Sequence, residues 1–507
     1  MLKKLSAIAV VALLVTSCAK EQEPEITSAD LVSKEDIKTM VEADLAAGSV
    51  FHWTSANDEV IYSAAMHSDS VFSIGYTPDP NFDFENKIHT IDLASPQWSK
   101  AWTKVMDVVL SYESKARGKK LTADELMPLG DDKEFPHMMV QLTSLELVKE
   151  LRSMDEVRFV EPLGFNFEDE AIKSRSGQGC NGSPDYGIST SDYSTESPNT
   201  KMPWNYPIHN IDDAWAYSQG DNIRLAILDT GASNSQDNLG SQFTQGQSGG
   251  RDIIKTSTLY SGSWWWRSLD SPHDDCGHGT SMAGIAAAPR GTDGNATGVA
   301  YKANLMSINS SQDVIISTSN ERKGVRDAMK AAANRSDVKI ISMSLGTPFY
   351  SSTVADGVFY AYNRNKLIFA AAGTSLSWTS WYPVIFPANM SQCRAVTGVR
   401  DGSNIQRCRT CHSGSEVDFV IVMERASDGD RTSISLASSS NQPKYTGGSS
   451  CATATTAGIA ALVWAENPSA SRSTIVDVLK QASHYYPNRN SQFGWGKIDA
   501  AAAVTGI

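Results

Sequence analysis

Three short segments place an aspartate, a histidine and a serine in settings that suit catalysis. Asp229 follows the apolar run 225–228 and precedes a glycine turn, His278 stands between two glycines, and Ser450 begins an alanine-rich stretch. A serine hydroxyl is a weak nucleophile until a histidine takes its proton, and that histidine needs a carboxylate to hold its tautomer. The three segments therefore hold every part of a nucleophilic relay.

Each segment taken alone has a simpler explanation. An Asp-Thr-Gly is usually a turn, a Gly-His-Gly can simply relieve crowding, and serine-rich runs are mostly loops or helix caps. The case depends on their joint occurrence at the tips of elements in one region. The helix expected after Ser450 also offers unpaired N–H groups and a positive dipole end, which suit a developing oxyanion.

The elements that must position these residues alternate along the second half of the chain. Short apolar runs expected to form buried strands occupy 225–228, 305–308, 338–341 and 367–371. Helical segments lie between them, as at 324–334 and 354–363. This alternation predicts an α/β fold in which helices cover both faces of a parallel sheet. Catalytic groups collect at the carboxyl edge of such a sheet, where Asp229 is expected.

The order Asp, His, Ser and its surrounding motifs resemble the subtilisin family over nearly all of residues 205–506. The matching motifs are LDTG (228–231), GHGTSMAG (277–284), GVAYKA (298–303), SMSLG (342–346), SSCATATTAG (449–458) and GWGKIDA (494–500). The resemblance implies a subtilisin-like three-layer fold, a parallel sheet with helices on both faces. It also implies a serine endopeptidase that acts on polypeptides and requires no cofactor for its chemistry.

The resemblance also assigns roles to individual residues. Ser450 attacks the scissile carbonyl, His278 serves as base and then as acid, and Asp229 orients the histidine. The backbone N–H of Ser450 supplies one oxyanion donor. The walls of the main side-chain pocket are Ser344, Leu345, Gly346, Ala371, Ala372 and Gly373.

Thr374 departs from the family pattern, which usually carries asparagine after the Ala-Ala-Gly of the oxyanion loop. A threonine hydroxyl can donate one hydrogen bond but is shorter than an asparagine amide. Losing such a donor outright slows an enzyme roughly 100- to 1000-fold. We therefore expect a working but slow protease whose oxyanion hole is formed by Thr374 and Ser450. The alternative is a catalytically silent subtilisin-like module that binds at the cell surface, although the complete Asp–His–Ser set favours the enzyme.

The N-terminus has the layout of an export signal. Lys3 and Lys4 precede an apolar run, 5–15, which is too short to span a bilayer permanently, and small residues lead to Cys18. A cysteine after Val-Thr-Ser resembles the lipobox of bacterial lipoproteins, in which the cysteine becomes the lipidated first residue. Residues 1–17 are thus expected to be a signal peptide, and the exported protein is expected to be anchored at the cell envelope through Cys18. The alternative is an ordinary cleaved signal in which this cysteine is incidental.

Composition predicts the remaining domains. Residues 18–30 are a polar tether, 31–167 an N-terminal region of mixed helix and strand, 168–202 a polar linker, and 203–507 the catalytic domain. In the N-terminal region we expect helices at 34–47, 102–112 and 144–151, and strands at 138–142 and 157–162.

Part of the N-terminal region, residues 138–162, resembles the end of the family's inhibitory propeptide. This resemblance implies a small α+β prodomain at about 100–165 that folds against the catalytic domain and lies in the active site until it is cut. Self-cleavage is expected within 163–200, where the chain is polar and accessible. Such a cut would separate the catalytic domain from the lipid unless the propeptide stays bound. The alternative is a permanent N-terminal domain.

Charge and metal-binding patterns exclude some functions and leave others open. A net charge of −13 without a basic stripe argues against nucleic-acid binding. Calcium is common in the subtilisin family, but no loop shows a recognisable ligand spacing. His273, Asp274 and Asp275 are read as a solvated turn rather than a metal site.

Six cysteines follow Cys18, and export places them where disulfides can form. They are Cys180, Cys276, Cys393, Cys408, Cys411 and Cys451. Six cysteines allow 15 pairings, among which sequence does not choose. The single CxxC at 408–411 is weak evidence for zinc, so a disulfide that involves Cys393, Cys408 or Cys411 is preferred.

Overall fold

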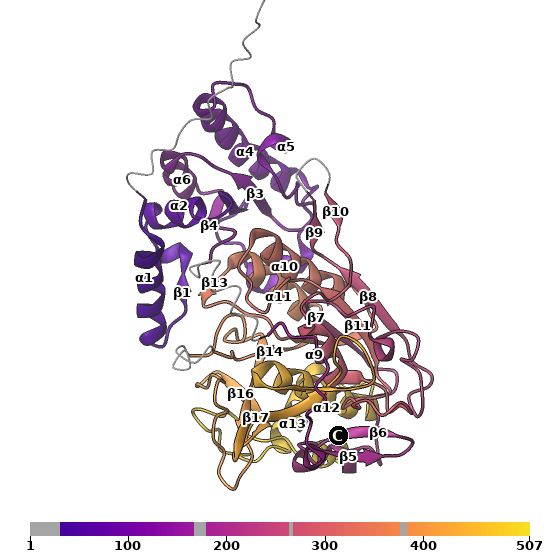
Figure 1. Ribbon diagram of the computed structural model, residues 1–507. Coiled ribbons are helices and arrows are strands. Elements are labelled where there is room, and N and C mark those ends of the chain that lie inside the picture. Colours follow the sequence, from indigo (N-terminus) through magenta and orange to yellow (C-terminus); the bar gives the residue numbers. More distant parts are fainter. Residues whose placement is uncertain (1–30, 167–178, 263–266, 376–382) are drawn as a thin grey trace, which may run out of the picture.

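The computed structural model describes residues 31–166, 179–262, 267–375 and 383–507 (Figure 1). Two units are visible: an N-terminal unit, drawn in indigo and purple, and a larger unit that contains the rest of the chain. Within the described ranges, no helix is both long enough and apolar enough to cross a membrane. Cys18 and the expected signal peptide lie outside these ranges.

The larger unit is built on a nine-stranded sheet with the order β18-β17-β16-β15-β14-β12-β7-β11-β8. The strands are β7 (Arg224–Asp229), β8 (Ile253–Ser257), β11 (Asn304–Asn309), β12 (Val338–Met343), β14 (Leu367–Ala371), β15 (Cys393–Arg400), β16 (Val417–Arg425), β17 (Asp428–Ser435) and β18 (Lys444–Thr446). Neighbours from β16 to β8 run parallel, while β17 and β18 add an antiparallel edge. The four predicted strands all lie in this sheet, which confirms the predicted α/β fold.

Helices cover both faces of the sheet. One face carries α9 (His278–Ala287), α12 (Gly448–Glu466), α13 (Arg472–Gln481) and α14 (Ala500–Thr505), and the other carries α10 (Ser319–Asn334) and α11 (Ser352–Asn363). The central strand β7 shows why its apolar run is continuous: Leu225 and Ile227 join the core on the α12 face, and Ala226 and Leu228 join the core on the α10 face. A strand buried on both faces has no polar alternation.

Helix α12 is buried on almost every side, as its uniformly small and apolar sequence requires. One close neighbour of this helix is the segment before β11. A Cβ atom at Gly458 would lie 2.6 Å from Cβ of Val299, so only glycine allows this approach. The packing of α12 against the sheet fixes where its first turn, and with it Ser450, is placed.

The N-terminal unit has an antiparallel sheet of order β3-β2-β4 and helices packed on it. Its elements are α1 (Lys34–Ala46), α2 (Asp58–Met66), β2 (Val71–Tyr76), α4 (Pro96–Ala116), β3 (His137–Gln141), α6 (Leu145–Arg152) and β4 (Val157–Pro162). The central strand β2 precedes residue 100, so this unit extends upstream of the predicted 100–165. All six residues of β2 are buried, and the alternation that would have revealed a strand is therefore missing.

The N-terminal unit packs on α10 and α11 of the larger unit (Figure 1). The Glu161 carboxylate of β4 accepts a hydrogen bond from the backbone N–H of Ser352 (2.9 Å), in the first turn of α11. Arg322 of α10 donates to the carbonyl of Pro162 (3.0 Å). Burial raises the pKa of Glu161 to about 7. The interface between the units therefore contains a buried polar cluster.

A second contact between the units is a strand pair. Strand β1 (Phe51–His52) pairs in parallel with β13 (Phe349–Tyr350). Phe349 is buried in the core of the N-terminal unit, where its ring lies 5.4 Å from that of Trp53. The two units therefore share both a sheet and a core.

The expected linker, 168–202, is partly structured in the range the structure describes. It contains β5 (Tyr193–Glu196) and β6 (Thr200–Pro203), which form a hairpin. Asp192, just before β5, is fully buried and accepts hydrogen bonds from Arg431 (2.7 Å) and from the Tyr445 hydroxyl (2.6 Å). Ion pairs and hydrogen bonds attach this segment to the larger unit. The scarcity of large apolar residues therefore did not mean that the segment is unstructured.

Candidate active site

Asp229 ends β7 at the carboxyl edge of the sheet, where the apolar run before it predicted it. Its Oδ1 accepts hydrogen bonds from Nδ1 of His278 (2.7 Å) and from the backbone N–H of Thr230 (2.8 Å). The aspartate is fully buried and His278 is 7% exposed. The structure thus brings together the first two residues of the predicted relay.

His278 begins α9, and steric constraints explain the glycine on either side of it. Gly277 caps the helix with a φ of 88°, a conformation that favours glycine. A Cβ atom at Gly279 would lie 2.3 Å from the carbonyl oxygen of Gly231, in the loop after β7. The glycines allow the histidine and aspartate loops to touch.

Asp274 is a buried carboxylate that joins these two loops. It accepts hydrogen bonds from the Thr230 hydroxyl (2.8 Å), from the Gly277 N–H (2.6 Å) and from the Thr280 N–H (2.7 Å). The expected solvated turn is therefore wrong for Asp274, which is 3% exposed, although the side chain of Asp275 is 96% exposed. Asp274 lies three residues before the Gly277 N-cap, so the usual N-cap pattern does not reveal its role.

Electrostatics at His278 favour the charged imidazolium. Burial lowers the pKa of His278, but the bonded Asp229 carboxylate and the nearby Asp274 outweigh burial, so its pKa lies above the usual 6.5. The neutral form, which can accept a proton, is therefore lost as the pH falls through that raised pKa.

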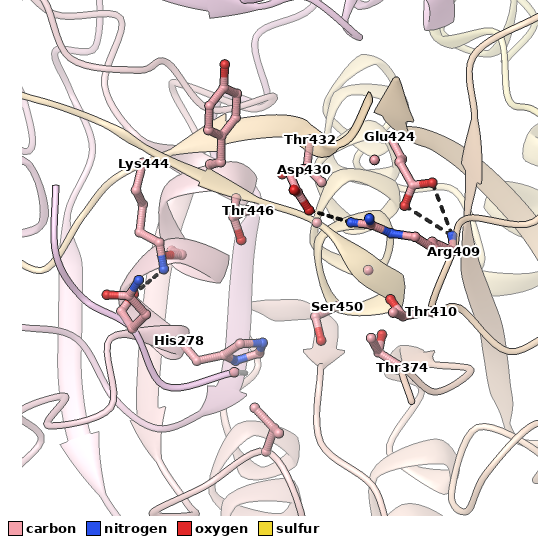
Figure 2. A pocket seen from close by; sticks show the side chains of 18 of the residues that line it. His278, Thr374, Arg409, Thr410, Glu424, Asp430, Thr432, Lys444, Thr446 and Ser450 are labelled. Atoms are coloured by element: carbon pink, nitrogen blue, oxygen red, sulfur yellow. Dashed lines mark hydrogen bonds and ion pairs between the residues drawn. The ribbon is translucent and has the colours of Figure 1, made fainter. Parts of the chain in front are cut away.

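Ser450 lies in the first turn of α12 and lines the same pocket of about 400 Å³ as His278 (Figure 2). Among the described residues, no direct hydrogen bond joins the two side chains, and no acceptor takes the backbone N–H of Ser450. An unpaired N–H at a helix N-terminus, next to the serine, can stabilise negative charge.

Thr374 follows β14 and lines this pocket as well. Its Oγ1 accepts a hydrogen bond from the backbone N–H of Ser449 (3.0 Å) and lies 2.9 Å from the Ser449 hydroxyl. That hydroxyl also accepts from the N–H of Gly373 (3.2 Å). When Ser449 donates to Thr374, the hydrogen of the Thr374 hydroxyl can turn toward the pocket.

The Cys408–Cys411 disulfide closes a short loop beside Thr374. The backbone N–H of Ser375 donates to the carbonyl of Thr410 (2.7 Å), and that of His412 donates to Gly373 (2.9 Å). The preferred prediction of a disulfide at 408 or 411 is confirmed. These two sulfurs are therefore not free thiolates for zinc, and in the described ranges no group of three His, Cys, Asp or Glu side chains could hold a metal.

The other cysteines divide into a bonded pair and two thiols. Cys180 bonds to Cys276, and Cys393 and Cys451 are buried and free. Burial raises the pKa of the Cys393 thiol to about 12, so it is inert.

The expected substrate-pocket walls lie at the carboxyl ends of β12 and β14, which pair in parallel. Of the described residues that line the pocket with Ser450, none belongs to this set of Ser344, Leu345, Gly346, Ala371, Ala372 and Gly373. Ser344 reaches the site through its hydroxyl, which donates to the Ser450 carbonyl (3.1 Å). Ile385 packs on the set, since its N–H donates to the Ala372 carbonyl (3.0 Å). The role of these walls stays a prediction.

Charged residues line the far side of the pocket (Figure 2). The Arg409 guanidinium donates to Asp430 (2.5 Å), and its backbone N–H donates to Glu424 (3.1 Å). Sequence reasoning missed them because they lie on the 408–411 loop and on the β16–β17 hairpin, outside every motif.

The geometry agrees with a comparison against known families. The sequence pattern of the Subtilase family matches residues 220–496, more than half of the chain. The chain belongs to the subtilase family. Family membership confirms the resemblance to the subtilisin family that the motifs indicated.

Two relatives of this subtilase illustrate the match. The minor extracellular protease Epr of Bacillus subtilis (strain 168) is 27% identical over 407 residues, which are 79% of this chain and 54% of Epr. Thermitase of Thermoactinomyces vulgaris is 28% identical over 291 residues, which are 57% of this chain and 91% of thermitase. The chain thus matches about half the length of Epr.

Fervidolysin of Fervidobacterium pennivorans, a keratinolytic enzyme related to subtilisin, is similar in structure. Its TM-score is 0.57 at 16% sequence identity, over 86% of this chain and 61% of fervidolysin. At that identity the likeness shows the fold alone, and it confirms the subtilisin-like three-layer arrangement.

The buried Asp274 should add to the effect of Asp229 in raising the pKa of His278. We expect Asp274→Asn to lower that pKa, because a negative charge is removed, and to lower the free energy of unfolding by about 1–3 kcal/mol, because an amide nitrogen would face the Thr280 N–H. NMR titration of the imidazole and thermal melting, both in a Ser450→Ala background, measure the two effects.

Asp275→Asn is the matched control for this prediction, since its exposed carboxylate should leave both values unchanged. Equal shifts in the two variants would show that Asp274 has no special role.

Proposed function

We propose that this subtilase is a serine endopeptidase that cleaves polypeptides through an acyl-enzyme. The observation that carries the proposal is the 2.7 Å bond between Asp229 and His278, because His278 lines the same pocket as Ser450. Family membership supports the same chemistry. No metal or cofactor takes part in any step.

Each step uses a group described above. Because Nδ1 of His278 is bonded to Asp229, Nε2 is left to take the proton of the Ser450 hydroxyl as its oxygen attacks the carbonyl. The new oxyanion would face the Ser450 N–H and the Thr374 hydroxyl. The imidazolium then protonates the leaving amine, and water, activated by the same histidine, hydrolyses the ester.

A fluorophosphonate probe tests the proposal, since it labels only an activated serine. We expect labelling of the matured protein and its loss in Ser450→Ala and in His278→Ala, because neither variant can form the nucleophile. His484→Ala, which removes an exposed imidazole, should label like the wild type.

The opposite result is equally informative. An unlabelled wild type that is correctly folded and matured would support the second candidate, a silent binding module, whose structural support is the missing bond between His278 and Ser450.

Thr374 is proposed as the second oxyanion donor. We expect Thr374→Val to lower kcat roughly 100-fold or more with little change in KM, because the only substrate group that this hydroxyl would contact is the oxyanion of the transition state. Thr374→Ser keeps the hydroxyl and should retain most of the activity. If valine and serine variants turn over peptide substrate equally fast, the donor is another group.

We further propose that the N-terminal unit is an inhibitory propeptide and that the protein is made as a zymogen. The contacts of Glu161 and Arg322 at the interface support this role, because they hold β4 against α10 and α11 of the larger unit. The backbone N–H of Phe165, beyond β4, donates to the Ser317 carbonyl (2.9 Å), which directs the chain toward the same region.

Cys18 is proposed as the site of lipid attachment that places the exported protein at the cell envelope. The layout of residues 1–17 and the cysteine after Val-Thr-Ser support it. We expect radiolabelled palmitate to enter the wild type and not Cys18→Ala when both are made in a bacterial host. Equal labelling of the two proteins would contradict lipidation at this residue.

A further inference from the structure

A segment of the expected linker forms part of the rim of the catalytic pocket. Gly179 and Asn181 line the same pocket as His278 and Ser450. Cys180, between them, is disulfide-bonded to Cys276, two residues before the histidine. A covalent bond therefore ties this segment, residues 179–185, to the loop that carries the proposed base. We call residues 179–185 the rim segment.

Backbone hydrogen bonds hold the rim segment to the loop before β18. The Ser438 N–H donates to the carbonyl of Gly182 (2.8 Å), and the Asp185 N–H donates to the carbonyl of Pro443 (3.0 Å). The Lys444 ammonium, seen above His278 in Figure 2, donates to the carbonyl of Asn181.

The other end of the rim segment contacts the loop after β11. A Cβ atom at Gly179 would lie 2.8 Å from the Val314 side chain, and the Cys180 sulfur lies 4.0 Å from the Asp313 carboxylate. The segment therefore runs along the His278 side of the pocket, from the 313–314 loop to the 438–444 loop.

At Gly182 the rim segment packs so closely that no side chain would fit. A Cβ atom at Gly277 would lie 2.4 Å from Cα of Gly182, and one at Gly182 would lie 2.2 Å from the Ser438 hydroxyl. Two backbones cross in direct contact here, and each has glycine at the crossing. This close packing indicates that the rim segment has a defined position on the larger unit.

The disulfide determines what a maturation cut can release. A cut before residue 179 leaves the rim segment at the start of the catalytic chain. A cut after Cys180 leaves that cysteine bonded to Cys276 through sulfur. Cleavage of the peptide chain alone therefore cannot remove Cys180 from the rim, and an oxidising compartment preserves the bond.

We propose that the rim segment stays on the pocket after maturation as a permanent wall of the substrate cleft, which rests on the proposed protease function. A wall on the His278 side narrows access to Ser450. The substrate class it admits is the extended, unfolded polypeptide, whose single strand needs only about 5 Å of width. Loops of folded proteins are excluded, because their flanking structure would collide with the rim segment.

The first test is the composition of the matured protein. Mass spectrometry under non-reducing conditions should find a peptide with Cys180 bonded to Cys276. A mature chain that begins after residue 185, with Cys276 unbonded, would overturn the proposal.

The second test compares substrates. The double variant Cys180→Ser/Cys276→Ser should cleave a native globular protein roughly tenfold faster than the wild type, while kcat/KM for a short peptide anilide stays within about a factor of two. Lys444→Gln removes one bond to the rim segment and keeps the disulfide. It should raise the ratio of native-protein to peptide cleavage as well, but by less. If the double variant fails to fold, Lys444→Gln provides the test instead.

The outcomes separate this inference from the proposed function. A protein that labels with fluorophosphonate but shows the same ratio of native-protein to peptide cleavage in all three forms overturns the role of the rim segment alone. If the wild type shows neither labelling nor cleavage, the proposed protease function is overturned. The proposed role of the rim segment in selecting substrates is then overturned as well.

Discussion

The candidate site depends on one buried carboxylate. Asp274 accepts hydrogen bonds from the loop after β7 and from the first turn of α9, and so it fixes the distance between the elements that carry Asp229 and His278. A buried charge is stable only when its acceptor positions are filled, and here N–H and hydroxyl groups fill them. The aspartate–histidine bond is thus a consequence of how two loops are held together.

Ser450 reaches the same place by a different route. Helix α12 is enclosed on nearly all sides, and its small residues let it approach the sheet closely, so the position of its first turn follows from close packing. Hydrogen bonding positions the acid–base pair and packing positions the nucleophile. The Thr374–Ser449 contacts position the proposed second oxyanion donor beside the nucleophile, because they tie the end of β14 to the start of α12.

The residues with chemistry could be located from sequence because each lies in a short motif with its own steric requirement, such as the glycines around His278. The parallel sheet could be predicted because apolar runs such as 225–228 are continuous. Strand β2 could not, since burial of both faces removes its alternation. The Cys180–Cys276 pairing could not either, because the rim segment is held largely by backbone hydrogen bonds, which have no pattern of side chains in the sequence. Motifs report side-chain chemistry, and they are silent on contacts made by the backbone.

The burial of Phe349 has a consequence for the stability of the larger unit. Phe349 of the larger unit is buried against Trp53 and Phe165 of the N-terminal unit, and such burial contributes about 1.5–3 kcal/mol. If the N-terminal unit were removed, this ring would meet water and β13 would lose its strand partner β1. The larger unit alone would therefore have a smaller free energy of unfolding than the same unit in the intact chain.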